Sequence, residues 1–210
     1  FSYFKCPACD PLFVNPRPPK NVLDYFYNHS EAVAASTKSL IENEKGRRIH
    51  IFNPRAKLIL GFLKKTGKTR GKLLEVGCSV GTFLDILRSK SAFYVEGLDP
   101  SAGAYEVTSA KGLKVHKDTL EKFRSEGVKY DAVFSFETIE HVFSPYHFLK
   151  KINGLLNVGG YVIFTTPNYH GFDMMVLGRH YKNIHAPCHL NYFNVDTIDT
   201  LLGRAGFEVR

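Results

Sequence analysis

The feature that most constrains the fold is an alternation of short apolar runs with helical stretches from residue 72 onward. The apolar runs are continuous, as in parallel strands that are buried on both faces. Parallel strands need crossover connections, which are usually helical and right-handed. We therefore predict an α/β fold with a doubly wound, mostly parallel sheet and helices on both faces. The expected strands are 73–76, 93–98, 113–116, 132–136 and 160–165, the expected helices are 82–90, 102–110, 120–126, 146–156 and 195–205, and a further strand starts at 207–209.

The first 50 residues are organised differently and predict a small helical and extended N-terminal arm. The run at 15–19 reads Asn-Pro-Arg-Pro-Pro and cannot lie inside a helix, because each proline removes a donor and restricts the residue before it. A short helix is expected at 22–27. Asn53 followed by Pro54 predicts the start of the next helix. We divide the chain into an arm at 1–50 and a ligand-binding domain at 51–210.

Composition narrows the class of protein. The chain has 210 residues, of which 44% are hydrophobic and 23% charged, as in globular proteins. No apolar run reaches the ~20 residues of a membrane span and no signal peptide opens the chain, so we expect a cytoplasmic protein without a membrane partner. Lys and Arg total 28 against 20 for Asp and Glu, a net charge of +8. This excess indicates either a solvated basic surface or an anionic partner, such as nucleic acid, a nucleotide or a phosphorylated sugar. The oligomeric state stays open.

Cys6 and Cys9 form a Cys-x-x-Cys pair near the start of the chain. A structural zinc site needs four ligands, usually from two such pairs, so we expect no metal on these two thiols in the 210-residue chain. Because the chain does not begin with Met, we expect the second pair to lie upstream of Phe1. The alternatives are a relic and a redox-active pair.

A glycine-rich loop at 75–81 separates the first expected strand from its helix. Gly77 and Gly81 leave space for a ligand against the turn, and the following helix directs its N-terminus toward that ligand. The second strand ends at Asp99, and 99 − 77 = 22, near the ~20 residues expected before a ribose-binding acid. An ordinary tight turn is the alternative. Further candidate ligands follow the next two strands: Asp118, Phe136 and Glu137.

Together these segments resemble the motifs of class I S-adenosylmethionine-dependent methyltransferases of the small-molecule branch. The resemblance rests on 74–84 (Leu-Glu-Val-Gly-Cys-Ser-Val-Gly-Thr-Phe-Leu), 97–101 (Gly-Leu-Asp-Pro-Ser), 130–142, 159–168 and 202–207. It covers 72–210 and implies a Rossmann-like fold, S-adenosylmethionine as cofactor and a small-molecule acceptor. The arm resembles the end of a zinc knuckle that precedes many bacterial members linked to sugar or cell-surface polysaccharide modification. An anionic acceptor of that kind would suit the basic surface.

The resemblance implies a set of cofactor-binding residues that follow the first four strands: Glu75, Gly77, Cys78 and Gly81 at the methionine part, Asp99, Pro100 and Ser101 at the ribose, Asp118 and Thr119 at the adenine amine, and Phe136 and Glu137 at the base or sulfonium. A helix N-cap is the structural alternative for Asp118. Two departures stand out. Ser79 occupies a position where the family usually has Gly, so the turn is less free to adopt a positive φ. The family sheet normally ends with two antiparallel strands; the first would start where this chain stops and the last is absent, so we expect the chain to be incomplete at both ends.

His141 follows the fourth strand, in the run Glu-Thr-Ile-Glu-His at 137–141. Methyl transfer from an activated donor needs mainly proximity and a dry, oriented site, but a hydroxyl acceptor also needs a general base. We expect His141 to be that catalytic base. The alternatives are a histidine that caps the loop or the next helix, and, from the resemblance, a divalent ion held by Glu137, Glu140 and His141. We assign no metal-binding residues.

A long connection at 168–192 follows the fifth strand and is rich in His and Tyr. Loops of this length are usually lids or binding segments, so we expect it to close over the acceptor. Tyr169, His185 and His189 are the expected acceptor contacts, and 172–177 could form one short helical turn. The sequence His185-x-x-Cys188-His189 lacks a fourth zinc ligand. A surface excursion or an oligomer contact through the apolar residues at 174–177 is the alternative.

Three other functions compete with a small-molecule methyltransferase. A nucleic-acid base methyltransferase needs an Asn/Asp-Pro-Pro-aromatic motif after the fourth strand, where this chain has Phe-Glu-Thr-Ile. Ser79 is the one feature that supports a non-catalytic nucleoside-binding scaffold. The Glu-His-Val run at 140–142 and the Gly-Gly strand argue against a nicotinamide dehydrogenase, although fold alone does not assign function.

Overall fold

The computed structural model describes residues 2–6, 11–181, 184, 186 and 188–209, without the side chains of Asn28 and Arg179. The chain forms two compact units. Unit 1 comprises Phe1–Leu23, Phe136–Gly154 and Phe164–Arg210, and unit 2 comprises Asp24–Ser135 and Leu155–Ile163. None of the helices in the described residues is both long and apolar enough to cross a bilayer.

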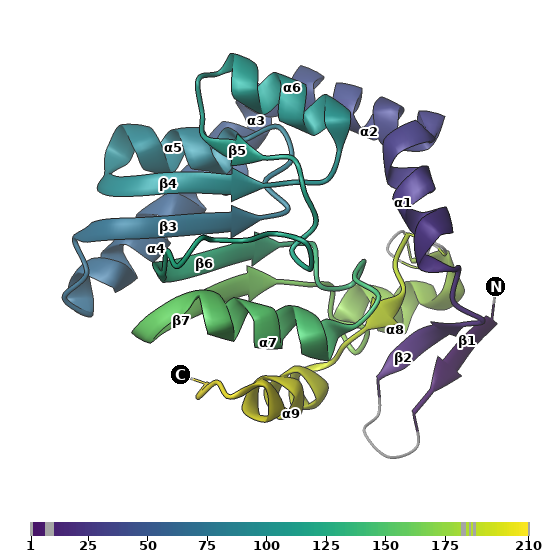
Figure 1. Cartoon of the computed structure of the whole chain (residues 1–210). Coiled ribbons are helices and arrows are strands. Elements are labelled where there is room, and N and C mark those ends of the chain that lie inside the picture. Colours follow the sequence, from purple (N-terminus) through teal and green to yellow (C-terminus); the bar gives the residue numbers. More distant parts are fainter. Residues whose placement is uncertain (1, 7–10, 182–183, 185, 187, 210) are drawn as a thin grey trace. The chain divides into compact units, whose positions relative to one another are not determined.

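A five-stranded sheet with the order β5-β4-β3-β6-β7 organises the fold (Figure 1). The strands are β3 (Arg70–Val76), β4 (Ala92–Leu98), β5 (Val115–His116), β6 (Tyr130–Phe136) and β7 (Leu156–Thr165). The central strand β3 pairs in parallel with β4 on one side, from Arg70↔Ala92 to Val76↔Leu98, and with β6 on the other. The strand order therefore reverses beside β3, and ligands of doubly wound sheets bind at the carboxyl ends of strands at such a point.

The helices expected between the strands are present in four of five cases. They are α5 (Thr82–Lys90), α6 (Ala102–Ala110), α7 (Pro145–Leu155) and α9 (Val195–Ala205), and another expected helix, α4 (Asn53–Lys65), precedes the sheet. From β3 the chain moves outward through α5 and α6 in one direction, and through α7 from β6 to β7 in the other. Right-handed crossovers in opposite directions lie on opposite faces of a sheet. The predicted doubly wound fold with helices on both faces is confirmed.

Two predicted elements are wrong. Residues 120–126 form turns in place of a helix: the Thr119 carbonyl accepts from the N–H groups of Lys122 and Phe123, and the positive φ of Glu126 (50°) and Gly127 (83°) is incompatible with a right-handed helix. The apolar residues that suggested the helix, Leu120 and Phe123, are buried in the turn. Residues 207–209 lie outside any strand. A strand needs a neighbouring strand to pair with, which local sequence does not reveal.

The N-terminal part of unit 2 contains more helix than its periodicity indicated. Helix α1 (Lys20–His29) includes the expected helix, and α2 (Glu31–Glu42), α3 (Glu44–Arg47) and the π-helical turn η1 (Arg48–Phe52) follow it. Ser30 caps α2, its side chain accepting from the N–H of Ala32. No residue of α2 is buried, which explains why the segment lacks an apolar stripe. The domain boundary at residue 50 stays a prediction.

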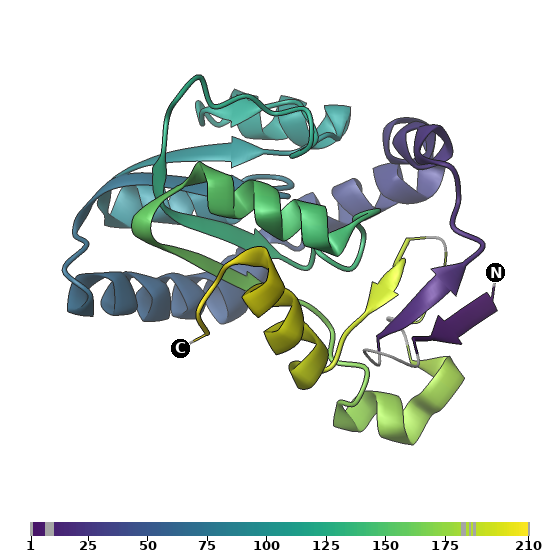
Figure 2. The same cartoon turned by 60° about the horizontal axis from the view of Figure 1, so that its bottom comes forward.

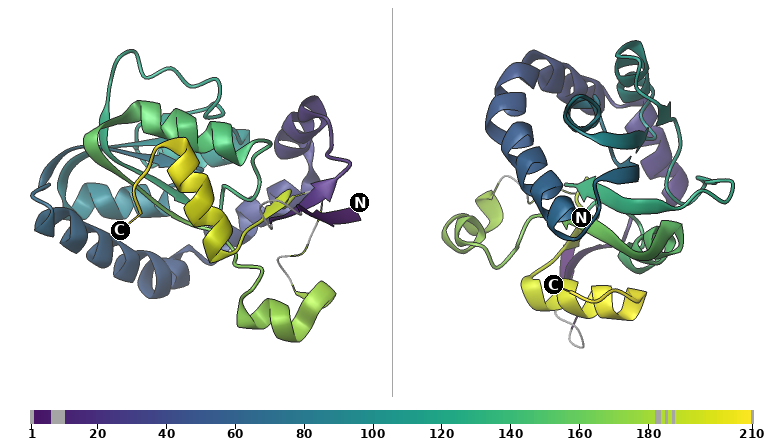
Figure 3. Two further views of the ribbon diagram at one scale, coloured as in Figure 1. Left: turned by 90° about the horizontal axis from the view of Figure 1, so that it is seen from below. Right: turned by 90° about the vertical axis from the view of Figure 1, so that its left-hand side faces the viewer.

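Unit 1 contains a second, smaller sheet (Figure 2), made of β1 (Ser2–Lys5), β2 (Leu12–Asn15) and β8 (Asn191–Tyr192). Strand β2 pairs antiparallel with β8 in the register Leu12↔Tyr192, so the arm is joined to a segment near the other end of the chain. Val14, Leu23, Leu190 and Tyr192 form its buried apolar cluster. The chain continues from β8 into α9 (Figure 3). Helix α8 (Phe172–Leu177) confirms the short helix expected there, and the 3-10 turn η2 (Gly178–His180) follows.

Candidate functional site

The glycine loop joins β3 to α5 and contains three positive φ angles. These are 77° at Gly77, 49° at Ser79 and 72° at Gly81, and α5 begins directly after Gly81. The N–H groups of Gly77 and Cys78 donate to the Leu98 carbonyl at 2.8 and 3.2 Å. The loop is therefore bound to the end of β4, where the next candidate residue, Asp99, follows.

Asp99 links the glycine loop to the start of α6. Its Oδ2 accepts from the N–H of Ser79 and its Oδ1 from the N–H of Ser101, both at 2.9 Å. The residue is 8% exposed, and burial raises the pKa of its carboxyl although these two backbone donors lower it. Each carboxylate oxygen has a second lone pair, so Asp99 can still accept from ligand hydroxyls.

Glu75, at the end of β3, carries an unsatisfied acceptor. The residue is 4% exposed, and its Oε2 has no hydrogen-bond partner in the part of the chain that the structure describes. Burial raises the pKa of this carboxyl well above its usual range; the charge of Arg55 lowers it and that of Asp99 raises it further. Buried polar atoms in native proteins almost always have partners, so Glu75 fits a site that receives a ligand donor such as an ammonium group.

The structure adds a packing reason for glycine at position 81. A Cβ on Gly81 would lie 2.7 Å from Thr108 Cγ2 and 3.0 Å from Leu113 Cδ1, which belong to the protein. Packing against α6 and the left-handed backbone therefore require glycine at position 81, and the approach of a ligand to Gly81 stays a prediction. Cys78 is 4% exposed, and its Sγ would lie 2.7 Å from a Cβ on Gly97. Burial raises the pKa of the Cys78 thiol, and only the backbone of this residue is suited to meet a polar ligand.

Ser79 adopts the positive φ that the sequence made doubtful. Two hydrogen bonds hold it there: its N–H donates to Asp99, and its carbonyl accepts from Thr108 Oγ1 at 2.8 Å. A non-glycine residue with positive φ costs of order 1–3 kcal/mol and persists where its surroundings fix it. Ser79 is therefore compatible with the loop and gives no support to a non-catalytic scaffold.

The remaining candidates of unit 2 lie after β4 and β5. Ser101 is the N-cap of α6, and Pro100 lies between it and Asp99. Asp118 accepts at 2.8 Å from the N–H of Thr119, and no helix follows that it could cap. The hydroxyl of Thr119 is buried without a partner among the described residues. Asp118 and Thr119 thus keep polar atoms for a ligand.

Phe136 and Glu137 belong to unit 1, and their contact with the cofactor stays a prediction. Phe136 ends β6, and Glu137 follows it with a φ of 50°. The Glu137 N–H donates to the Thr165 carbonyl at 2.9 Å, and its Oε1 accepts from Thr165 Oγ1 at 2.7 Å. The carboxylate of Glu137 is therefore engaged with the end of β7.

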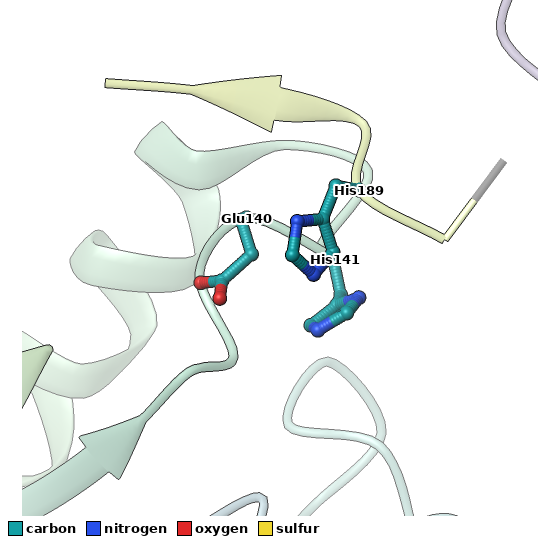
Figure 4. Close-up of side chains that lie close together, drawn as sticks. All are labelled: Glu140, His141 and His189. Atoms are coloured by element: carbon teal, nitrogen blue, oxygen red, sulfur yellow. The ribbon is translucent and has the colours of Figure 1, made fainter. Parts of the chain in front are cut away.

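Unit 1 brings three other side chains together: Glu140, His141 and His189 (Figure 4). Each offers a ligand atom within 4.8 Å of the others. The Nδ1 of His141 lies 2.8 Å from the Cys188 carbonyl, which can only accept, so Nδ1 carries the proton and the neutral ring has its lone pair on Nε2. The rings of His141 and His189 meet edge to face, with centroids 4.5 Å apart.

Glu140 is the most deeply buried member of this cluster, at 1% exposure. Its Oε2 accepts from Thr166 Oγ1 at 2.9 Å, whereas its Oε1 has no partner among the residues described. Burial raises the pKa of this carboxyl to about 7, and the nearby charge of Glu137 adds to the effect. The cluster thus contains a carboxyl that can exchange a proton near neutral pH.

The three expected acceptor contacts have different surroundings. His189 is 6% exposed and lies in the cluster, whereas Tyr169 packs against the apolar cluster of Val14 and Tyr192. His185 lies outside the described residues, as does Cys9 of the Cys-x-x-Cys pair. Cys6 is partly buried. Their roles stay predictions.

Sequence reasoning missed the contacts that assemble the cluster. Asn191 donates to the carbonyls of Glu140 (3.3 Å) and Val142 (2.8 Å), and Arg17 of the arm donates to the Asn191 side chain at 2.7 Å. His141 and Cys188 are 47 positions apart, so no local pattern could have revealed their bond. The sequence signal available for this cluster was the adjacent pair Glu140 and His141, which lies after the buried strand β6.

The chain is similar in sequence to several curated methyltransferases. A ubiquinone biosynthesis O-methyltransferase of Azorhizobium caulinodans is 26% identical over 150 residues, which are 66% of this chain and 59% of the relative. The same enzyme of Shewanella sp. (strain ANA-3) is 29% identical over 150 residues, 66% of this chain and 62% of the relative. The chain thus spans about three fifths of the length of these curated relatives.

The fold is that of solved methyltransferases. The structure of magnesium protoporphyrin IX methyltransferase from Synechocystis PCC 6803 with bound SAH aligns with a TM-score of 0.67 and 16% identity, covering 91% of each chain. The sequence model of a methyltransferase domain matches residues 47–210, well over half of the chain. The chain belongs to this methyltransferase domain family.

Proposed function

We propose that this chain is an S-adenosylmethionine-dependent methyltransferase that acts on a hydroxyl group of a small molecule. The observation that carries the proposal is the pair of buried acids at the glycine loop, Glu75 and Asp99, in a chain of the methyltransferase domain family.

The residues present fit S-adenosylmethionine. Asp99 offers acceptors for the two ribose hydroxyls, and Glu75 Oε2 offers one for the ammonium group of the methionine part. Asp118 and Thr119 are the partners for the adenine amine. The backbone of 77–81 borders the methionine part, and the roles of Phe136 and Glu137 stay those that the resemblance implies.

When bound, S-adenosylmethionine supplies a methyl group that is activated by its attachment to a positively charged sulfur. The protein contributes proximity, orientation and removal of the acceptor's proton. His141 takes this proton on Nε2. The Cys188 carbonyl holds Nδ1–H in place, which fixes the tautomer and stabilises the imidazolium that forms.

A hydroxyl acceptor is supported by two observations. The curated relatives are O-methyltransferases, and a base is of use for a hydroxyl, whose proton must leave. A sugar or polysaccharide precursor is the acceptor that the arm's resemblance and the net charge of +8 favour.

Calorimetric titration with S-adenosylhomocysteine tests the cofactor assignment. We expect one binding site per chain and no binding of NAD under the same conditions. Transfer of a labelled methyl group from S-adenosylmethionine to candidate phenols and sugars then tests the acceptor class. Binding of NAD in place of S-adenosylhomocysteine would overturn the proposal.

The segment at 168–192 is proposed to contact the acceptor. Replacing His185 and His189 by Ala is expected to spare S-adenosylhomocysteine binding and to lower turnover about tenfold, on the order of 1.4 kcal/mol of transition-state stabilisation. His180→Ala is the matched control, because this histidine is exposed in the same segment. Equal turnover of the double variant and the control would show that the segment is scaffold.

A further inference from the structure

Arg17 of the N-terminal arm is a half-buried cation in unit 1. The salt bridges found among the described residues do not include it. Its Cζ lies 5.8 Å from the centroid of the Phe13 ring and 5.6 Å from that of the Phe143 ring. Burial lowers the pKa of this guanidinium, because desolvation disfavours the charged form. A charge buried at such a cost is kept where hydrogen bonds compensate it.

Arg17 donates two side-chain hydrogen bonds among the described residues. Its Nη1 donates to the Phe143 carbonyl, and its Nη2 donates to Oδ1 of Asn191 at 2.7 Å. Since a guanidinium can only donate, this bond fixes which end of the Asn191 amide faces Arg17. The other end, Nδ2, donates to the carbonyls of Val142 at 2.8 Å and Glu140 at 3.3 Å. Arg17 therefore orients an amide that holds the loop after β6.

This loop carries His141, and the segment that holds the loop carries the hydrogen-bond partner of His141. Nδ1 of His141 donates to the Cys188 carbonyl at 2.8 Å. Two residues further on, the Leu190 N–H donates to the Glu140 carbonyl at 2.8 Å, and the Leu190 carbonyl accepts from the N–H of Val14 in β2 at 2.9 Å. The segment is thus bonded to the arm and to the loop after β6, all within unit 1.

We propose that Arg17 is a positioning residue for His141, an inference that rests on the proposed function. Arg17 acts through Asn191, whose amide keeps the loop after β6 beside Cys188. The Cys188 carbonyl then stays in reach of Nδ1, and Nε2 keeps the lone pair that takes the acceptor's proton. The proline-rich run at 15–19 supplies the restricted backbone from which Arg17 reaches Asn191.

The tautomer of His141 tests the proposal without any turnover. Long-range ¹H–¹⁵N spectra are recorded at about pH 8, where histidine side chains are ordinarily neutral, and the His141 signals are assigned by their loss in His141→Ala. Wild type is expected to carry the proton on Nδ1. Arg17→Ala is expected to show both tautomers in comparable amounts, because the Asn191 amide is no longer oriented and the Nδ1–H bond to Cys188 loosens.

Two further variants make this measurement specific. Arg17→Lys keeps the charge but one donor direction only, so an intermediate tautomer ratio is expected, which tests the proposal even where Arg17→Ala does not fold. Arg204→Ala is the matched control. It removes an exposed arginine of the same unit that lies over the Tyr146 ring at 5.7 Å, and it is expected to keep the wild-type tautomer.

Methyl transfer to the phenol or sugar that the labelled-methyl assay finds to react fastest gives a second measurement. Arg17→Ala is expected to lower kcat about tenfold and to leave the Kd of S-adenosylhomocysteine within about twofold, since Glu75 and Asp99 lie in unit 2. In the His141→Ala background the same substitution is expected to lower the residual kcat by less than about twofold, because the base that it positions is absent. A general structural role would lower kcat equally in both backgrounds.

A wild-type tautomer ratio in either Arg17 variant, or equal losses of kcat in the two backgrounds, would overturn the proposal. Failure of the proposed function gives a different result. A chain that binds no S-adenosylhomocysteine refutes the methyltransferase proposal, whereas the tautomer spectra of the same samples still decide whether Arg17 positions the His141 ring.

Discussion

The glycine loop of unit 2 and the histidine cluster of unit 1 are built in different ways. In the loop, the backbone N–H groups of Ser79 and Ser101 converge on one acid, Asp99. In the cluster, the side chains of Glu140, His141 and His189 provide the functional atoms, and backbone carbonyls only orient them. A site made from backbone depends on conformation and close packing, whereas a site made from side chains depends on the identity of each one.

The largest expected effect tests whether the glycine loop depends on its backbone conformation and close packing. Gly81→Ala is expected to lower the free energy of unfolding by roughly 3 kcal/mol, because a Cβ clashes with Thr108 and the φ of 72° disfavours any side chain. Gly67→Ala is the matched control: its φ is 81° but a Cβ there meets nothing within 4 Å, so only the backbone cost of about 1 kcal/mol applies. Urea denaturation measures both, and equal losses would show that packing at Gly81 is unimportant.

Asp99→Asn is expected to weaken S-adenosylhomocysteine binding about tenfold to a hundredfold, which corresponds to about 1.4–2.7 kcal/mol. The amide keeps one acceptor for the two backbone donors and loses the charge that strengthens hydrogen bonds to the ribose. Glu96→Gln, on the strand β4 that precedes Asp99 and 4% exposed, is the control. Wild-type affinity of Asp99→Asn in titration calorimetry would remove Asp99 from the site.

Ser79→Gly tests the same dependence on backbone conformation with a substitution that is expected to stabilise the chain. Glycine adopts the φ of 49° without strain but loses more entropy on folding, so we expect a net gain of about 0.5 kcal/mol in the free energy of unfolding. Glu126→Gly, with a φ of 50° outside the loop, is expected to gain a similar amount. A loss of stability in Ser79→Gly alone would mean that the serine side chain itself supports the loop.

The smallest expected effect concerns acid stability in unit 2. Burial raises the pKa of Glu96, but the hydrogen bond from His116 and the charge of Lys114 outweigh it, and the net pKa is lowered. A lowered folded-state pKa contributes stability above the unfolded value of about 4.5, and this is lost as the pH falls through the folded value. Wild type is therefore expected to lose more stability than Glu96→Gln from about pH 5 to pH 3 in denaturant titrations. Parallel curves for the two proteins would contradict this.

Most of the parallel sheet could be predicted from the sequence, because local apolar patterns indicate both buried strands and amphipathic helices. Strand β4 and helix α6 have nearly the bounds expected. The prediction of a helix at 120–126 is wrong because Leu120 and Phe123 can be buried equally well by a turn. Helices without a buried stripe, such as α2, leave little trace in periodicity.

The sequence by itself determined the glycine loop, the acid after β4 and the family, since these depend on residues that are neighbours along the chain or at the ends of adjacent strands. Only the tertiary structure decided the packing around Gly81, the hydrogen bonds that hold Ser79, and the contact of His141 with His189. Each depends on contacts between segments distant in sequence, such as the 47 positions between His141 and Cys188. Local patterns record which face of an element is buried, but not which other segment buries it.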